Sequence, residues 1–377
     1  PTEPKTDKPF PYQPIPVEPF TKELYENIHK VGVKAFPIPI AVNLKEEEEN
    51  DSKLVLGNFD GFPDPTESKI DSHVYGVRVA LKNKNVKLIK NALVKKLVSN
   101  EQGTEVKQVE VEIDGEIEFF SGDLVIVAGG AINSAALLLK STSHKHPNGL
   151  GNAFDLVGRN YMSHINGCLI AFTPEKLNLA PFQKYFCIGD YYWGDTDYSY
   201  PLGEIQLMGK NDPSTYTYFA PESLKGQDAK YISQHAIDFW LTSEDIPMHD
   251  NRVLVTKENQ IQLIYHREKN NVASFEKLKL KLKAIMEKVG QIDPNLKNIT
   301  WDGYDLGISG VSHQCGTLKF GEKPENSVLD IHCKVHGVEN LYVVDASFFV
   351  SCGAYNPSLT IAANALRVAD YLKNQIL

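Results

Sequence analysis

A histidine in a loop and an asparagine before a helix are the residues of this chain best suited to chemistry. His313 stands in the segment 312–317 (SHQCGT), and Asn356 precedes Pro357 in the C-terminal section. An imidazole titrates near neutral pH and is the commonest general base of proteins. His313 is therefore a candidate general base, although it is one of eleven histidines in the chain.

The segment around Asn356 predicts the start of a helix. Asn356 fits the N-cap, and Pro357 fits the first helical position, where no N–H is required. The free amides and the dipole of a helix N-terminus favour an anion, and the small residues before Asn356 allow a ligand to approach. The alternative interpretation is that this is only a well-capped helix.

A metal site is the alternative interpretation of the histidines near residue 313. Histidine and cysteine recur five times within 24 residues, at His313, Cys315, His332, Cys333 and His336. Structural zinc sites need paired ligands at short repeated spacings, which only Cys333 and His336 approach. We therefore expect no metal.

The elements that position these residues follow an α/β pattern. A continuous apolar strand, buried on both faces, is expected at 123–128 (DLVIVA). Gly129, Gly130 and a helical segment at 133–141 follow it, and ligands of α/β folds lie at the carboxyl end of such strands. A second buried strand is expected at 341–344 (LYVV).

Further elements follow from apolar periodicity. Helices are expected at 20–34 and 274–289, and short strands at 85–89, 92–98, 106–113 and 117–120, with a hairpin turn at Asp114–Gly115. Six strand-like runs within 165–270 predict an antiparallel sheet. The proline-rich segment 1–20 is predicted to form an extended arm, and segments 45–51 and 58–65 are predicted to be loops.

Composition and charge exclude several classes of protein. The 377 residues are 42% hydrophobic and 23% charged, which argues against extended disorder. A net charge of −9 repels phosphate backbones, so we expect no nucleic-acid partner. No apolar run approaches the roughly 18–20 residues that span a bilayer. Five scattered cysteines and the lack of a visible signal peptide predict free thiols and a cytoplasmic location.

Four motifs in this order resemble the glucose–methanol–choline (GMC) oxidoreductases, flavin enzymes that oxidise alcohols. The motifs are Gly129–Leu139, Ser312–Thr317, Leu341–Ser347 and Asn356–Pro357 with its helix. Segments 157–164 (VGRNYMSH), 244–247 and 251–253 also resemble family segments. The resemblance runs from about Val86 to Leu377 and is to bacterial members related to pyranose and glycoside oxidases. It implies FAD as the cofactor and a sugar, glycoside or polyol as the substrate.

The resemblance also implies roles for single residues. His313 takes the place of the base, Asn356 that of its partner, and the helix amides near Thr360 would face the flavin. The implied cofactor-binding residues are Val94, Ala128, Gly129, Asp345, Ala346, Pro357 and Thr360. Asn160 and His164 lie in a segment that lines one side of the flavin in the family. Plain structural roles are the alternatives, a strand core for Val94 and a turn cap for Asp345.

One family feature is not found in the sequence. Relatives open with a G-x-G-x-x-G loop that binds the FAD pyrophosphate, and this chain contains no such pattern. We therefore expect the N-terminal FAD-fingerprint portion to be absent. The chain is then part of a split enzyme completed by a partner chain or N-terminal fragment, a truncated form of a longer protein, or a scaffold that has lost FAD. The coherence of His313 with Asn356 favours the first two.

The sequence thus predicts a mixed α/β (α+β) fold. A partial FAD-binding Rossmann-like domain is expected at 81–160 and 306–377, after an arm at 1–80. A substrate domain with an antiparallel β-sheet flanked by helices is expected at 161–305. The predicted activity is FAD-dependent oxidation of a CH–OH group, with hydride passing to flavin N5. The alternative is a non-catalytic partner or scaffold subunit on a decayed GMC fold.

Overall fold

The chain forms two compact units, each assembled from three segments. The structure is a computed structural model, and it describes residues 10, 14–43, 67–180, 184–219, 222–310 and 312–376. Unit 1 comprises Pro1–Leu88, Asn166–Ser243 and Ala273–Leu306, and unit 2 comprises Ile89–Ile165, Glu244–Val272 and Gly307–Leu377. The loops expected at 45–51 and 58–65, and most of the arm expected at 1–20, lie outside the described residues.

Unit 1 is built on a sheet that has six strands within the described residues, in the order β1-β7-β8-β9-β6-β12. Their bounds are β1 Ala35–Pro37, β6 Ile165–Phe172, β7 Phe186–Ile188, β8 Glu204–Leu207, β9 Ala236–Ser243 and β12 Thr300–Asp305. The pairs β1·β7, β7·β8, β8·β9 and β6·β12 are antiparallel, as the sequence predicts. The last two of the six expected runs are not in this sheet, because they form a hairpin of their own in unit 2.

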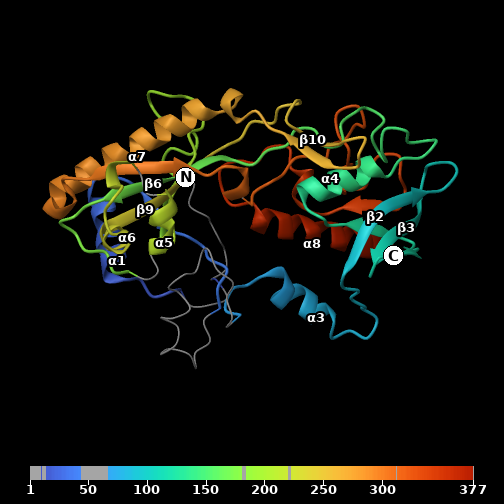
Figure 1. Cartoon of the computed structure of the whole chain (residues 1–377), viewed down its shortest axis with the longest axis horizontal. Helices are drawn as coiled ribbons and strands as arrows, with labels where there is room; N and C mark the ends of the chain where they lie inside the picture. Colours follow the sequence, from blue (N-terminus) through green and yellow to red (C-terminus); the bar gives the residue numbers. More distant parts are fainter. Residues whose placement is uncertain are drawn as a thin grey trace. The chain divides into compact units, whose positions relative to one another are not determined.

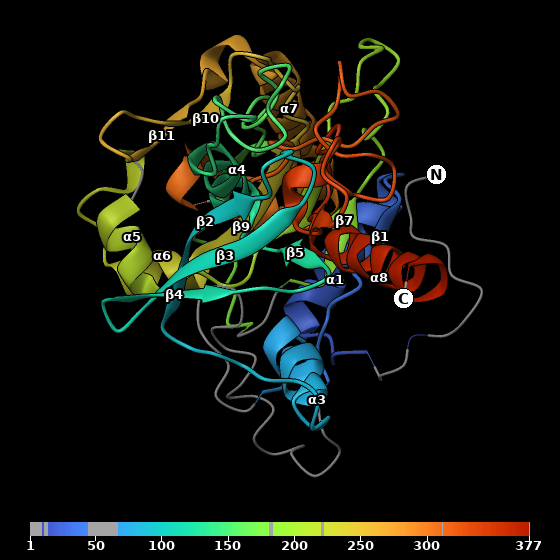
Figure 2. The same ribbon diagram turned by 90° about the vertical axis from the view of Figure 1, so that its right-hand side faces the viewer.

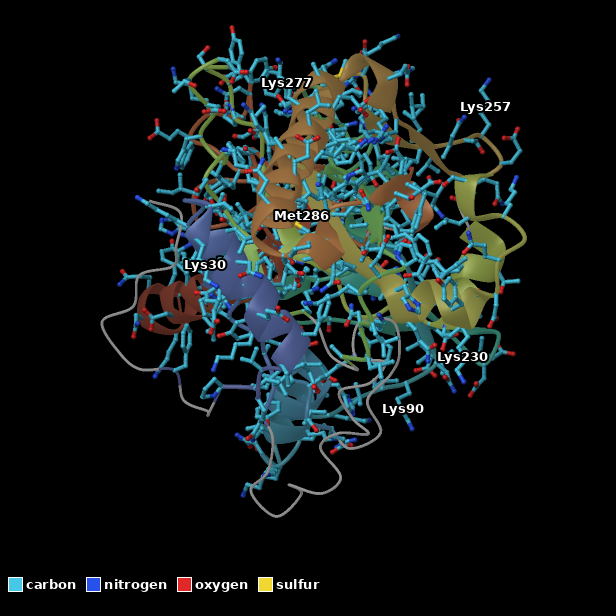
Figure 3. The ribbon with its side chains drawn as sticks, turned by 90° about the vertical axis from the view of Figure 1, so that its left-hand side faces the viewer. Lys30, Lys90, Lys230, Lys257, Lys277 and Met286 are labelled. Carbon is cyan, nitrogen blue, oxygen red and sulfur yellow. The ribbon has the colours of Figure 1, made fainter. Side chains whose placement is uncertain are left out.

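Helices cover both faces of this sheet, which explains why β6 is buried along its whole length. The helices are α1 Pro19–Lys30, α5 Pro213–Phe219, α6 Ala229–His235 and α7 Val272–Ile292, and a further short helix, α3 Arg78–Ala80, buries none of its residues. In Figure 1, α7 runs along one side of β6 and β9, and α5 and α6 lie on the other. The expected stripe of α7, from Phe275 to Val289, is buried. Figure 3 labels Lys277 and, further along the same helix, Met286, which is fully buried.

Unit 2 contains an antiparallel sheet of three strands in the described chain, β2 Ala92–Ser99, β3 Val106–Ile113 and β4 Glu116–Phe120 (Figure 2). Asp114 and Gly115 join β3 to β4 with φ values of 52° and 87°, the left-handed backbone that a two-residue hairpin needs. The strand expected at 85–89 is wrong. No strand forms there, and Val86 and Leu88 are exposed, because no neighbouring strand pairs with that segment in the described chain.

A short parallel pair lies beside a helix in the same unit. β5 (Val125–Val127) pairs with β13 (Leu341–Val343), and α4 (Ala131–Lys140) follows β5. The expectation that β5 is buried on both faces is wrong, since Ile126 is 52% exposed while Val127 is buried. Alternate residues of a strand point to opposite faces, and only the Val127 face contributes to the core of unit 2.

The remaining elements of unit 2 are a hairpin and the C-terminal helix. β10 (Arg252–Val255) pairs with β11 (Ile261–Ile264), and α8 runs from Ser358 to Gln375. Val368 and Leu372 anchor α8 in the core, whereas Leu359 in its first turn is 81% exposed. The second half of α8 is therefore anchored in the core, while its first turn stays accessible.

Candidate active site

An antiparallel backbone bridge brings two histidines of unit 2 together. The N–H of Met162 donates to the carbonyl of Cys315 at 3.0 Å, and the N–H of Cys315 donates back at 2.9 Å. In antiparallel pairing, the residue two places after Met162 lies opposite the residue two places before Cys315. These residues are His164 and His313, so local backbone pairing sets their approach.

The two imidazoles contact each other through their Nδ1 atoms. The Nδ1–Nδ1 distance is 3.0 Å, and the rings meet edge to face at 79° with centroids 4.9 Å apart. His164 directs Nε2 to the backbone carbonyl of Cys352 at 3.2 Å. His313 directs Nε2 toward Nδ2 of Asn356 at 3.5 Å. The structure thus brings together His313, Asn356 and His164.

These contacts fix the tautomers of the neutral pair. A carbonyl oxygen only accepts, so Nε2 of His164 carries the proton and its Nδ1 is a lone pair. Nδ1 of His313 must then donate to His164, which leaves Nε2 of His313 unprotonated. The bare nitrogen is the one that lies next to the Asn356 carboxamide, which donates. This arrangement can remove a proton from a hydroxyl group placed beside Asn356.

Asn356 does not cap the following helix. α8 begins at Ser358, its N-cap residue is Pro357, and no side chain caps it. The expected N-cap role of Asn356 is therefore wrong, because its carboxamide is directed to His313 instead. The first intrahelical bond joins Ile361 N–H to the Pro357 carbonyl. The backbone amides of residues 358–360 come before this bond, as at any helix N-terminus.

A buried cluster that the sequence did not predict lies behind His164. It contains Cys315, Cys352 and Asp245, each less than a tenth exposed. The carboxylate of Asp245 accepts Ser163 N–H at 2.8 Å and the Tyr265 hydroxyl at 2.9 Å. Burial raises the pKa of Asp245 to about 7. Cys315 and Asp245 stand inside segments that the sequence singled out, but nothing in residue spacing reveals that they meet.

Asp345 joins the two strand ends of the parallel pair. Its carboxylate accepts Gly130 N–H at 2.9 Å, the Ser134 hydroxyl, and Ser347 N–H at 2.9 Å. Ser134 in turn accepts Gly129 N–H at 3.0 Å. Asp345 therefore caps the turn after β13 and fixes the glycine turn after β5.

The other predicted cofactor-binding residues differ in exposure. Ala346 is buried, and its carbonyl accepts Gly316 N–H at 3.1 Å, which links it to the loop of His313. Ala128 and Thr360 are exposed, and Val94 is 40% exposed on β2. No contact of the described chain brings Val94 to the histidines.

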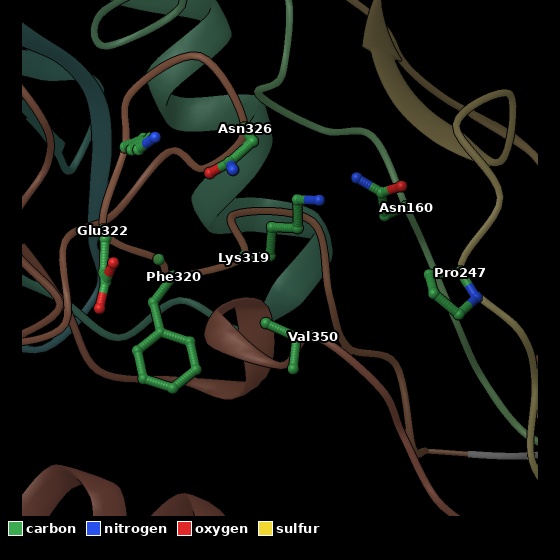
Figure 4. A pocket seen from close by; sticks show the side chains of 9 residues that line it. Asn160, Pro247, Lys319, Phe320, Glu322, Asn326 and Val350 are labelled. Atoms are coloured by element: carbon green, nitrogen blue, oxygen red, sulfur yellow. The ribbon is translucent and has the colours of Figure 1, made fainter.

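Asn160 lines a pocket apart from the histidine pair. The pocket has a volume of about 530 Å³ and is lined by Asn160, Pro247, Lys319, Phe320, Gly321, Glu322, Lys323, Asn326 and Val350. Figure 4 shows the side chains of Asn160 and Lys319 directed toward each other. None of the lining residues is His313, His164 or Asn356.

Comparison with known protein families decides what kind of site this is. Two family models described as GMC oxidoreductase match the chain. The N-terminal model matches residues 14–166, and the C-terminal model matches residues 249–365. The chain belongs to the GMC oxidoreductase family. The expectation that the N-terminal portion of this GMC oxidoreductase is absent is wrong, because the N-terminal match begins at residue 14.

Relatives of this GMC chain are named as dehydrogenases and oxidases. It is 26% identical to 2-methyl-1,2-propanediol dehydrogenase of Mycolicibacterium austroafricanum, over 67% of this chain and 48% of the relative. It is 28% identical to paromamine 6'-oxidase of Streptomyces fradiae, over 67% of this chain and 46% of the relative. The chain thus spans about half the length of these curated relatives.

A solved structure shares the mixed α/β fold. Pyridoxine 4-oxidase from Mesorbium loti superimposes with a TM-score of 0.63 at 16% identity, over 96% of this chain and 71% of that chain. In the part of the chain that the structure describes, no helix is long and apolar enough to cross a membrane. Across those same residues, no three His, Cys, Asp or Glu side chains gather in a way that can hold a metal ion.

Proposed function

We propose that this chain is an FAD-dependent oxidoreductase that acts on CH–OH groups of a sugar, glycoside or polyol. The observation that carries the proposal is the contact of His313 Nε2 with the Asn356 carboxamide, at the accessible start of α8. Membership of the GMC family supports the reaction class.

The exposed residues at the strand and helix ends fit a flavin nucleotide. The first turn of α8 offers backbone amides around Thr360, and a helix N-terminus favours an electron-rich group. Gly130, with φ of 83°, has open space where a side chain would stand, so a ligand can approach the backbone there. The exposed Val94, Ala128 and Gly129 and the buried Asp345, Ala346 and Pro357 complete the proposed binding set.

Bound FAD would supply the acceptor for the carbinol hydride. The protein's own part is to bind the substrate hydroxyl and remove its proton. Asn356 would hold the oxygen by a hydrogen bond, and His313 Nε2 would accept the proton. His164 holds the ring of His313 in the required tautomer through the Nδ1 contact.

The substrate class follows from relatives whose names include a diol and paromamine. We propose polyols and glycosides on that ground. Asn160 and the pocket it lines are proposed to contribute on the substrate side.

Flavin binding and reduction test the proposed function. The purified chain is expected to bind FAD with visible flavin absorbance, and a polyol or glycoside is expected to bleach it under anaerobic conditions. His313→Ala should slow bleaching by about two to four decades, because the proton acceptor is lost. His144→Ala, a substitution of an exposed histidine in the same unit, is the matched control and should leave the rate unchanged.

Two outcomes would contradict the proposal. Failure of the chain to bind FAD would support the scaffold alternative. Bleaching at the wild-type rate in His313→Ala would remove His313 as the base.

A further inference from the structure

The pocket that Asn160 lines carries positive charge, although the chain as a whole is acidic. Lys319, Lys323 and Glu322 are the charged residues among its lining, so two positive charges and one negative give +1, whereas the 377 residues carry −9. The volume of about 530 Å³ falls within the roughly 300–1,000 Å³ of small-molecule sites. The pocket is therefore large enough for a small ligand, and its charge favours an anion.

The ammonium group of Lys319 lies in this pocket without a counter-ion. Lys319 is partly buried, and among the described residues its side chain makes no ion pair and no hydrogen bond. Lys176 and Lys281, which are also partly buried, are each held by two carboxylates. Shielding a charge from water without a partner is unfavourable. Lys319 is thus placed to pair with a group that the described chain does not supply.

Two carboxamides line the same space as Lys319. The side chains of Asn160 and Lys319 are directed toward each other across the pocket, and Asn326 is a further lining residue (Figure 4). Neither carboxamide makes a hydrogen bond to another residue of the described chain. An ammonium and two carboxamides can present several N–H donors to one oxygen-rich group, and donors to a charged acceptor form the stronger hydrogen bonds.

The nearby carboxylates do not occupy this space. Glu322 is exposed and points away from Lys319 (Figure 4). Glu244 accepts a hydrogen bond from the hydroxyl of Ser351. Neither Glu244 nor Glu325 is among the residues that line the pocket. The donors therefore face the pocket without a competing carboxylate from the described chain.

The backbone around Lys319 holds these donors in place. The carbonyl of Lys319 accepts Val328 N–H at 3.0 Å, and Phe320 N–H donates to the Phe348 carbonyl at 3.1 Å. The rings of Phe320 and Phe348 meet edge to face with centroids 5.6 Å apart. Asn160 has a left-handed φ of 60°, which asparagine tolerates better than most residues. Donors positioned before binding reduce the entropy lost when a ligand binds.

We propose that this pocket binds the anionic group of a small molecule, a carboxylate or a phosphate, through the ammonium of Lys319 and the carboxamides of Asn160 and Asn326. Phe320 and Val350 supply apolar surface for the carbon skeleton that carries the anion. Binding uses ionic contacts and hydrogen bonds alone, so no covalent bond forms or breaks.

Two sources can supply such an anion. Asn160 precedes His164 by four residues, so their Cα atoms are at most about 14 Å apart. An acidic substituent at the far end of an extended substrate is the first source, and it rests on the function proposed above. A separate small acid, bound while the substrate is oxidised, is the second source and needs only the pocket.

Calorimetric titration of the purified full chain tests the anion site without FAD. The probes are gluconate and inorganic phosphate, and glucitol is the uncharged match to gluconate. Gluconate should bind about tenfold more tightly than glucitol, as expected for a charge-assisted hydrogen bond. Its affinity should fall as salt is added, because the ionic contact is partly open to solvent.

Substitutions assign the binding to the pocket. Lys319→Gln should weaken the binding of gluconate about tenfold, because the charge is lost, whereas Lys319→Arg should retain it. Asn160→Gly keeps the left-handed φ and should weaken binding several-fold. The matched control is Lys257→Gln, which removes the same charge from an exposed lysine of unit 2 outside the pocket. Its affinity for gluconate should equal that of the wild type.

Kinetics of the FAD-loaded protein distinguish the two sources. If the anion belongs to the substrate, Lys319→Gln should raise KM for gluconate about tenfold with little change in kcat, and should leave KM for glucitol unchanged. If the anion is a separate molecule, phosphate should change the rate of glucitol oxidation in the wild type and have no effect in Lys319→Gln.

The anion site and the oxidoreductase function fail in different ways. Equal affinities for gluconate and glucitol with no binding of phosphate would overturn the site. An unchanged affinity in Lys319→Gln, or an equal loss in Lys257→Gln, would also overturn it. Anion binding that depends on Lys319 in a chain that takes up no FAD leaves the site in place and removes the oxidoreductase function.

Discussion

At the scale of single residues, the base depends on a chain of acceptors behind it. The Cys352 carbonyl accepts from His164, and His164 accepts from His313, so the tautomer of His313 is set by a carbonyl two residues away in this chain of contacts. A histidine whose tautomer is fixed in this way needs no change of protonation before it takes a proton. The carboxamide of Asn356 then defines where the hydroxyl must lie.

Substitution of Asn356 separates substrate positioning from stability. Asn356→Ala should lower kcat/KM about tenfold, the size of one lost hydrogen bond to the substrate oxygen. Because Asn356 is exposed and does not cap α8, the free energy of unfolding should change by less than about 0.5 kcal/mol. Steady-state kinetics and urea unfolding measure the two quantities. A wild-type kcat/KM would exclude the positioning role.

At the scale of elements, a glycine turn holds the histidine-bearing segments against their neighbours. Gly158 N–H donates to the Thr317 carbonyl, and the Gly158 carbonyl accepts Val253 N–H, both at 2.8 Å. Gly158 has φ of 86°, and a Cβ atom there would lie 2.4 Å from the Val253 carbonyl oxygen. The close approach of these two backbones therefore requires glycine.

Two alanine substitutions test this close approach. Gly158→Ala should destabilise the protein by more than about 3 kcal/mol, because backbone strain adds to a steric clash. Gly115→Ala is the matched control: its φ is 87°, but no atom lies within 4 Å of the added Cβ. It should cost only about 1 kcal/mol. Thermal unfolding followed by circular dichroism compares them, and equal losses would show that the clash at Gly158 is relieved.

The elements show how far sequence reasoning extends. Local signals sufficed for the hairpin at Asp114–Gly115 and for the buried stripe of α7, because both depend on neighbouring residues. They failed for Ile126, whose burial depends on what packs against β5. The order of motifs predicted the meeting of His313 with Asn356. The cluster of Cys315, Cys352 and Asp245 escaped prediction because it is assembled by pairing between segments distant in the sequence.

At the scale of the whole molecule, the tryptophans lie in one unit and the candidate active site lies in the other. Trp193, Trp240 and Trp301 all lie in segments of unit 1, whereas His164, His313 and the cluster behind them lie in unit 2. Tryptophan fluorescence therefore reports on unit 1, whereas signals of His164 and His313 report on the candidate site in unit 2.

The titration of Asp245 should govern how the stability of the protein depends on pH. Its pKa is about 7 in the folded chain and about 3.9 in an unfolded one, so the folded state binds more protons between these values. The stabilisation is fully present below about pH 4 and is lost as the pH rises through about 7. The free energy of unfolding should fall by roughly 2–4 kcal/mol over that range.

Asp245→Asn should remove most of this fall. The carboxamide oxygen can still accept from Ser163 and Tyr265, and its nitrogen would occupy the position of the unpartnered Oδ1. The variant should therefore match the wild type below about pH 4 and exceed its stability near pH 8, as measured by urea unfolding followed by circular dichroism. Parallel pH profiles for wild type and Asp245→Asn would mean that Asp245 is ionised throughout, and that its charge is compensated within the fold.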